Sequence, residues 1–289
     1  MKKVIFISLL AFFALSLNTA FAQNDSIYVM RNGSVIWKYK FSDIDSIIYY
    51  NPDNINIPDT PIDTGTLITG TFTDSRDGYE YSWVQIGSQI WMAENLKYLP
   101  SVVGPGTGSS SEAYYYVYGY DGTDVEEAKA TENYATYGVL YNWTAAMAGA
   151  GSSNSIPSGV QGICPEGWHL PSDAEWQQLE MYLGMSETDA NSTGLRGTVE
   201  GGKLKEAGYD HWQSPNEGAN NESGFTALPG GGRGSYGNFH HIGQIGYWWS
   251  STEKGTNDAW YRYLYFNNSN VTRNYYYSES GFSVRCVRD

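Results

Sequence analysis

A helical repeat of apolar positions begins after residue 172. Ser172 is a favourable N-cap, and Glu175 stands three positions later, as in a capping box. Trp176, Leu179 and Leu183 then follow at helical spacing. The pattern therefore predicts a helix from Ser172 to about Leu183, with the side chains of Trp176 and Leu179 facing the core.

The remaining pattern favours strands, turns and loops. A second helix is predicted within residues 137–147, ending at Gly149. From Gly184 onward Gly, Asn and Ser dominate, so long loops are expected. Two early helices before a β-rich sequence predict an α+β fold with a small antiparallel sheet and long irregular loops. The β-prone runs predicted as strands are 69–81, 81–90, 247–251, 260–266 and 282–287.

The first residues have the features of a signal peptide over residues 1–22. Lys2 and Lys3 precede an apolar stretch, and Ala20-Phe21-Ala22 is a small-x-small cleavage site. The alternative is an uncleaved membrane anchor. No later stretch is long and apolar enough to span a bilayer, so no membrane span is expected in the mature chain. The protein is predicted to be exported: secreted, on the cell surface or in the periplasm.

Residues 23–50 predict a small β unit that precedes the main domain. Two β-prone runs flank Asn32-Gly33, a dipeptide that is typical of hairpin turns. Residues 51–65 contain three prolines and several Asp and Asn residues, which indicates a linker. Residues 66–289 then have the length of one domain.

Charge and composition narrow the range of partners. The formal charge is −14, and it falls to −16 when Lys2 and Lys3 leave with the signal peptide. Such a charge argues against nucleic acid and anionic membranes as partners. The chain has 25 Tyr, 10 Trp and 33 Gly, and aromatic residues among small polar ones form rigid contact surfaces. A protein or glycan ligand at the cell surface is the expected partner.

The chain has two cysteines, Cys164 and Cys286. In an oxidising compartment two cysteines most simply form one disulfide. That bond would close a loop of more than a hundred residues. The alternative is a pair of reduced, buried thiols.

Catalytic and metal-binding patterns are weak. The four histidines show no metal-ligand spacing, and the glycine-rich run 230–235 lacks the lysine of a phosphate loop. No catalytic residue is predicted. Four residues offer clustered oxygen atoms that could bind calcium. The expectation is nevertheless a polar loop without metal, and no cofactor is predicted. The calcium candidates are Asp210, Asn216, Glu217 and Glu222.

Several ordered motifs are typical of one family. They are Gln89-Ile-Trp-Met-Ala-Glu-Asn-Leu96, Tyr137-Gly-Val-Leu-Tyr-Asn-Trp143, Cys164-Pro-Glu-Gly-Trp-His-Leu-Pro171, Gly202-Lys-Leu-Lys205, Gly224-Phe-Thr-Ala-Leu-Pro-Gly230, Trp248-Trp-Ser-Ser-Thr-Glu253 and Gly281-Phe-Ser-Val-Arg-Cys286. Over about residues 70–289 the chain resembles the Fibrobacter succinogenes major paralogous domain. That family occurs in exported, often surface, proteins of gut and fibre-degrading bacteria, and its activity is largely uncharacterised.

Residues 170–176 and 281–285 are also similar to the C-type-lectin-like group, which includes the formylglycine-generating enzyme. The resemblance implies a C-type-lectin-like domain. That enzyme holds copper with active-site cysteines, whereas Cys164 and Cys286 stand at motif positions that favour a structural disulfide. The leading hypothesis is a non-catalytic binding or adhesion module. The alternatives are an enzyme distantly related to the formylglycine-generating group and a structural component of the cell envelope.

Residues 257–280 are the predicted binding region, because they are dense in Asn, Tyr, Ser and Arg. The segment resembles the variable region of retroelement-diversified proteins, which gives a further alternative. An ordinary polar hairpin is another, with its tyrosines packed on a Tyr-rich surface excursion over residues 101–133. Strand alternation places three of the tyrosines on one side, away from Trp260 and Leu264. The predicted binding residues are Tyr261, Tyr263, Tyr265, Asn268, Asn270, Arg273, Tyr275 and Tyr277.

Five tryptophans in the motifs are predicted to lie in the core instead. They are Trp91, Trp143, Trp168, Trp176 and Trp248.

Overall fold

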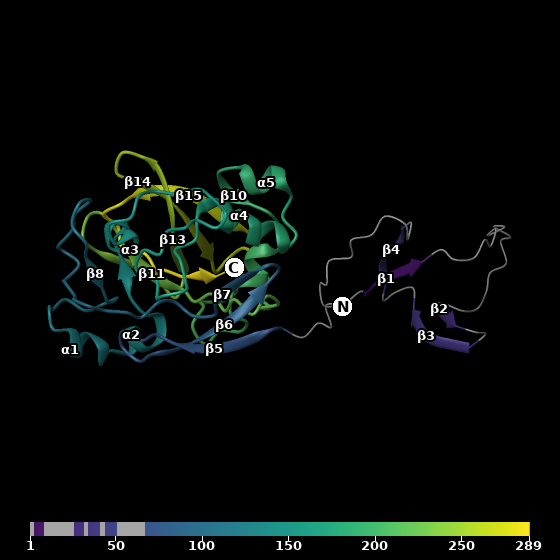
Figure 1. Ribbon diagram of the computed structural model, residues 1–289. Coiled ribbons are helices and arrows are strands. Elements are labelled where there is room, and N and C mark those ends of the chain that lie inside the picture. The colour runs from purple at the N-terminus through teal and green to yellow at the C-terminus, as the bar shows by residue number, and fades with distance from the viewer. Residues whose placement is uncertain (1–2, 9–25, 32–33, 41–43, 51–66, 289) are drawn as a thin grey trace. The chain divides into compact units, whose positions relative to one another are not determined.

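The structure is a computed structural model (Figure 1), and its contacts divide the chain into two units, residues 1–66 and 67–289. The residues that it describes are 3–8, 26–31, 34–40, 44–50 and 67–288.

In the first unit, β2 (Ser26–Arg31) pairs antiparallel with β3 (Ser34–Lys40), as predicted for these two runs. Strand β1 (Lys3–Ser8) pairs in parallel with β4 (Ile44–Tyr50). The predicted turn at Asn32-Gly33, the signal cleavage site and the linker lie outside the described residues.

The second unit is an α+β domain (Figure 1). A six-stranded sheet has the order β10-β15-β14-β13-β11-β12, a four-stranded sheet has the order β16-β7-β6-β5, and β8 pairs with β9. The strands are β5 (Thr69–Thr73), β6 (Glu80–Ile86), β7 (Gln89–Met92), β8 (Tyr115–Tyr116), β9 (Leu140–Tyr141), β10 (Gly194–Arg196), β11 (Gly230–Arg233), β12 (Phe239–Ile242), β13 (Ile245–Gly255), β14 (Asp258–Tyr265), β15 (Val271–Tyr277) and β16 (Val287–Arg288). The helices are α1 (Val125–Lys129), α2 (Glu132–Tyr137), α3 (Trp143–Met147), α4 (Asp173–Tyr182), α5 (Glu187–Asn191) and α6 (Glu200–Leu204).

The six-stranded sheet separates two hydrophobic clusters, because successive side chains of a strand point to opposite faces. On the disulfide face, which carries Tyr247, Trp249 and Tyr261, the sheet packs on the cluster that holds both cysteines. On the helix face, which carries Trp248 and Leu264, it packs on the cluster that holds Trp176 and Leu179 of α4. The buried aromatic side chains of β13 and β14 named here therefore belong to one of two separate interiors.

Helix α4 confirms the prediction from the apolar repeat. The Ser172 hydroxyl accepts from the backbone N–H of Glu175 (3.1 Å), and the Glu175 carboxylate accepts from the backbone N–H of Ser172 (2.8 Å). Trp176 and Leu179 are buried. The helix thus combines a capping box at its first turn with an apolar face against the core.

The other helix prediction was partly wrong. The helix expected within residues 137–147 is only α3, since Gly138 has a φ of 75° and Leu140–Tyr141 form β9. It ends at Ala148, which has a left-handed φ of 48°. Helices α1, α2, α5 and α6 were not predicted as helices, because segments of five or six residues are too short to show a helical repeat.

Two further expectations need correction. Residues 282–287 do not form one strand, because Phe282 and Ser283 make isolated bridges to Tyr141 and Trp248 before the short strand β16 begins. The Tyr-rich excursion is also not wholly on the surface. Tyr116 within it is buried, and its hydroxyl donates to the backbone oxygen of Thr107 (2.8 Å).

The predicted disulfide between Cys164 and Cys286 is present, and both cysteines are buried. It joins the segment before α4 to the segment before β16. The backbone oxygen of Cys286 also accepts from the N–H of Met92 in β7 (3.0 Å). The bond therefore fixes the end of the domain to two distant parts of the chain.

Replacing both cysteines with alanine should lower the free energy of unfolding by about 2–5 kcal/mol, because the unfolded chain loses a large covalent loop. Urea titration of the oxidised wild type and the double variant measures the difference. Reductant should destabilise the wild type and leave the variant unchanged. Equal unfolding midpoints for all four samples would show that the bond does not stabilise the fold.

Within the described residues, the helices are too short or too polar to cross a lipid bilayer.

Candidate functional site

The sheet separates the eight predicted binding residues, so they do not form one surface. Three lie on the disulfide face of β14: Tyr261, Tyr263 and Tyr265. Three lie in β15, in register with the residues of β14 that point to the helix face: Arg273, Tyr275 and Tyr277. The last two lie in the turn between these strands: Asn268 and Asn270. Alternation was predicted correctly for β14, but the other five residues do not extend that side.

Tyr261 is a core residue, with 6% of its surface exposed. Its ring lies 4.9 Å from that of Phe282 and 6.1 Å from that of Trp249. Burial and the neighbouring phenols of Tyr263 and Tyr276 raise its pKa far above the usual range, so it stays neutral. A side chain with so little exposed surface offers little contact area to a ligand. Tyr263 and Tyr265 are only partly buried.

Arg273 belongs to an ionic cluster between the sheet and α4. Asp173 accepts from Arg262 (2.6 Å) and from Arg273 (2.7 Å). Glu180 accepts from Arg262 (2.6 Å) and from Arg196 (2.8 Å). Burial raises the pKa of Asp173, but the attraction of Arg262 and Arg273 outweighs it and the pKa is lowered. The cluster holds α4 against the sheet, and the Arg273 guanidinium is occupied by its salt bridge with Asp173.

Asn268 and Asn270 fix the turn around a buried lysine. Lys205 Nζ donates to the backbone oxygens of Glu217 (2.9 Å), Tyr265 (3.1 Å) and Asn268 (2.9 Å). Burial lowers the pKa of this ammonium to about 8. Asn270 Nδ2 donates to the backbone oxygen of Gly197 (2.5 Å). These contacts are internal to the fold.

The calcium candidates do not converge on one point. The Asn216 amide donates to the backbone oxygens of Glu206 (2.9 Å) and Gly208 (2.8 Å). Glu217 and Glu222 are exposed, and so is Asp210. Across residues 67–288, no three acidic, His or Cys side chains are grouped as a metal site would require.

The exposed aromatic residues of the predicted region form the tyrosine segment, Tyr275, Tyr276 and Tyr277. These side chains are 42%, 37% and 52% exposed. Strand β10 pairs only with residues 271–273 of β15, so the tyrosine segment runs past the end of that neighbouring strand. The ring of Tyr275 lies 5.5 Å from that of Trp260, and the ring of Tyr276 lies 5.3 Å from that of Tyr277. A firmly held strand end thus presents three aromatic side chains to solvent.

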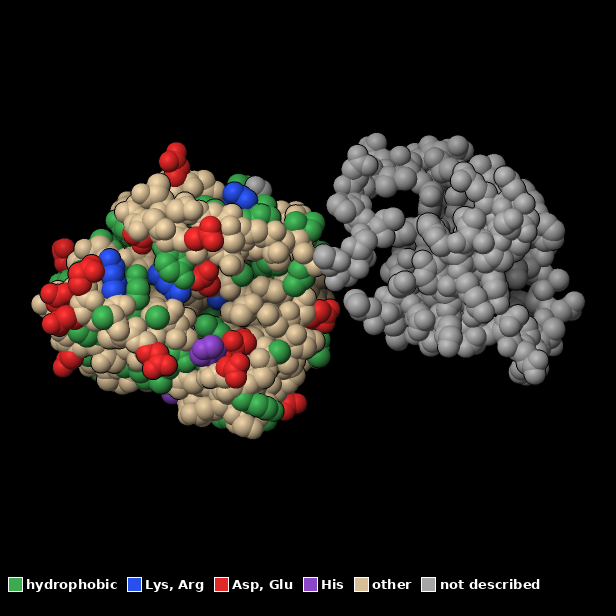
Figure 2. Space-filling view, turned by 90° about the horizontal axis from the view of Figure 1, so that it is seen from below, with side chains coloured by type: hydrophobic (Ala, Val, Ile, Leu, Met, Phe, Trp, Pro, Cys, Tyr) green, Lys and Arg blue, Asp and Glu red, His purple; other side chains and the backbone are tan. Residues whose placement is uncertain are grey.

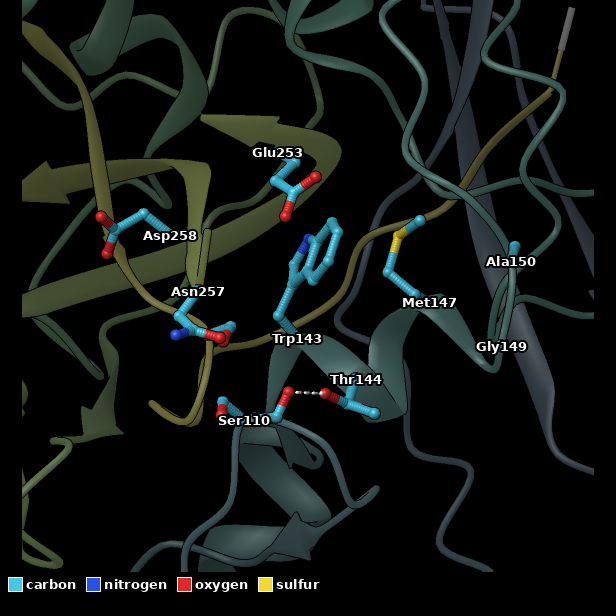
Figure 3. A pocket seen from close by; sticks show the side chains of 10 residues that line it. Ser110, Trp143, Thr144, Met147, Gly149, Ala150, Glu253, Asn257 and Asp258 are labelled. Atoms are coloured by element: carbon cyan, nitrogen blue, oxygen red, sulfur yellow. Dashed lines mark hydrogen bonds between the residues drawn. The ribbon is translucent and has the colours of Figure 1, made fainter. Parts of the chain in front are cut away.

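A pocket of about 170 Å³ adjoins this segment (Figure 3). We call it the Trp143 pocket. The tip of the β13–β14 hairpin forms one wall, and α3 with the residues after it forms another. Because Asp258 is in register with Tyr277, the pocket and the tyrosine segment lie at the same end of the sheet. The lining residues are Ser110, Trp143, Thr144, Met147, Gly149, Ala150, Glu253, Asn257, Asp258 and Ser278.

Trp143 is held rigidly at this pocket. Asn142 caps α3 by accepting from the N–H of Ala145 (3.0 Å), and the Trp143 indole N–H donates to the backbone oxygen of Ser250 (2.8 Å). Thr144 Oγ1 donates to the backbone oxygen of Ser110 (2.9 Å), the dashed bond in Figure 3. The prediction that Trp143 is a core residue was wrong, since it is only partly buried. The other four motif tryptophans are buried as predicted.

Acidic side chains outnumber basic ones on the face of the domain drawn in Figure 2. This agrees with 31 acidic against 17 basic residues in the whole chain.

Comparison with known proteins gives a family and nothing more specific. No curated protein and no solved structure matches the chain. The model of the Fibrobacter succinogenes major domain matches residues 84–288. That match includes α4, both cysteines, the tyrosine segment and the Trp143 pocket. Since it covers most of the sequence, the chain belongs to the Fibrobacter succinogenes major domain family.

Proposed function

We propose that this protein is an exported, non-catalytic binding module that recognises a protein or glycan ligand, built on a C-type-lectin-like scaffold. The observation that carries the proposal is the tyrosine segment. Three consecutive tyrosines, each more than a third exposed, stand at the end of a strand in the central sheet. Tyrosine side chains combine a rigid apolar ring with a hydroxyl group, which suits recognition surfaces.

The local backbone favours contact through side chains. The Asn274 side-chain oxygen accepts from the N–H of Tyr275 (2.9 Å), so it occupies one donor of the strand. An occupied donor makes pairing with a foreign strand less favourable. The tyrosine rings, held in place by the register with β14, remain available to a ligand.

Three ionisable groups with clear pKa shifts, Asp173, Lys205 and Arg285, have structural roles. Asp173 forms salt bridges with Arg262 and Arg273 between the sheet and α4. Lys205 donates hydrogen bonds to backbone oxygens. Arg285 is buried, which lowers its pKa to about 9, and it donates to the backbone oxygens of Phe225 and Thr226. Each of these groups has a structural partner inside the fold, which differs from the convergent groups of a catalytic pocket.

A screen of residues 23–289 against glycans and surface proteins should identify a ligand. Replacing Tyr275 and Tyr277 together with alanine should then raise Kd at least about tenfold, because exposed tyrosines often dominate binding energy. The melting temperature should be unchanged, since both side chains are exposed. Calorimetry and thermal unfolding measure the two quantities.

Tyr236→Ala provides the matched control, because Tyr236 is 93% exposed and lies outside the tyrosine segment. It should retain wild-type affinity. Wild-type affinity in the double variant would refute the proposed surface. A loss of folding in the double variant would show that the two tyrosines are structural.

A further inference from the structure

The Trp143 pocket combines an aromatic ring with negative charge. Its lining includes the indole of Trp143, the thioether of Met147 and the carboxylates of Glu253 and Asp258, and it includes no Lys or Arg side chain. Among residues 67–288, neither carboxylate takes part in a salt bridge. Among the described residues, neither carboxylate of the pocket is therefore paired directly with a Lys or Arg side chain.

The arrangement of these groups is directional. Figure 3 shows the Glu253 carboxylate turned toward the Trp143 side chain, and the Met147 thioether beside it. The Trp143 ring cannot turn freely, because its N–H is bonded to the backbone oxygen of Ser250. A group bound here would meet an aromatic ring, a carboxylate and a polarisable sulfur atom together.

Ser278 gives an independent indication of a bound group. Its backbone N–H donates to the oxygen of Asn257 (2.8 Å), and its backbone oxygen accepts from the N–H of Trp143 (2.8 Å). Ser278 is also one of the residues that line the pocket, and it is only 3% exposed. The buried hydroxyl has no hydrogen-bond partner among the residues that the structure describes. Buried polar groups usually have hydrogen-bond partners, and a donor group of a ligand would supply one for this hydroxyl.

We propose that the Trp143 pocket binds a primary ammonium group, presented as a lysine side chain of a protein ligand. An ammonium group over an indole face gains cation–π attraction, and Glu253 would add a charge-assisted hydrogen bond. An ammonium group carries three N–H donors, so donors remain for a hydroxyl acceptor such as that of Ser278. A neutral sugar would leave the carboxylate charge unbalanced, and an anion would be repelled by it.

The size of the pocket agrees with a single side chain. Its volume of about 170 Å³ is below the roughly 300–1,000 Å³ of sites that hold drug-sized molecules. The pocket proposal rests on the proposed function, because it takes the ligand to be a protein. The tyrosine segment would contact the surroundings of the lysine while the pocket takes its end.

A titration with N-acetyl-lysine methylamide tests the pocket without the natural ligand. In ¹⁵N-edited NMR spectra, the indole N–H signal of Trp143 should shift saturably, and Trp143→Phe assigns that signal by its loss. The same compound with an acetylated side-chain amine should cause no shift. Glu253→Gln should weaken binding about tenfold, since it removes a charged hydrogen-bond partner. Glu187→Gln, an exposed change in α5, should leave binding unchanged.

Equal shifts with the amine and its acetylated form would overturn the proposal. Unchanged binding in Glu253→Gln would do the same, and Glu253 is exposed, so this variant is expected to fold. A saturable shift with a methyl glycoside, but not with the amine, would assign the pocket to a sugar. The Tyr275 and Tyr277 double variant is tested with the screened ligand, so failure of the pocket and failure of the proposed binding surface are distinguishable.

Discussion

Replacing Trp176 with alanine should lower the free energy of unfolding by about 3–5 kcal/mol. The side chain is 1% exposed and lies in the cluster between α4 and the sheet. Its ring is 4.7 Å from that of Trp91 and 5.8 Å from that of Phe225. Truncation would remove a large buried area and leave a cavity among rings that cannot easily close it.

Urea unfolding monitored by circular dichroism measures this effect without relying on tryptophan fluorescence. Met181→Ala is the matched control, because Met181 lies on the same helix and is 40% exposed. It should change stability by less than about 0.5 kcal/mol. If Trp176→Ala unfolded at the wild-type urea concentration, the assignment of this face of α4 to the core would be wrong.

Glu180→Gln should destabilise the domain by a similar amount, about 3–5 kcal/mol. Glu180 accepts from Arg196 and Arg262, and all three residues are almost completely buried. Glutamine has nearly the same shape, so the packing is kept while the charge is lost. Arg196 would then be a buried cation without a carboxylate partner, which is costly in a medium of low polarity.

The same urea titration applies, with Glu187→Gln as the control for an exposed carboxylate. That variant should stay within about 0.5 kcal/mol of the wild type. In Glu180→Leu the carboxylate is also lost, and the new side chain accepts no hydrogen bond from either arginine. If Glu180→Gln retained wild-type stability, the ionic cluster would not contribute to holding α4 on the sheet.

Local signals were sufficient to predict several features of the domain. The helix at α4 was predictable because its cap, its charged third position and its apolar repeat all lie within twelve residues. The disulfide was predictable because the sequence offers a single pairing. The strands that became β13 and β14 were found from their aromatic and β-branched composition, although their ends differed by several residues.

Alternation along β14 was also readable, but the environment of each face was not. Alternation places Tyr261 and Arg262 on opposite faces of the strand. It does not predict that Phe282 packs on Tyr261 or that carboxylates of α4 pair with Arg262. Both faces of this central sheet are covered by distant segments. For that reason the predicted binding set combined a core tyrosine, an arginine of the ionic cluster and two of the three exposed tyrosines.

The sequence by itself determined the family motifs, helix α4, the disulfide pairing and the aromatic character of the late strands. Only the tertiary structure decided which aromatic residues face solvent and where a pocket forms. Trp143, Glu253 and Ser278 are separated by long stretches of chain and meet through sheet register and two backbone hydrogen bonds. Such a site depends on long-range contacts, whose geometry no local spacing in the sequence encodes.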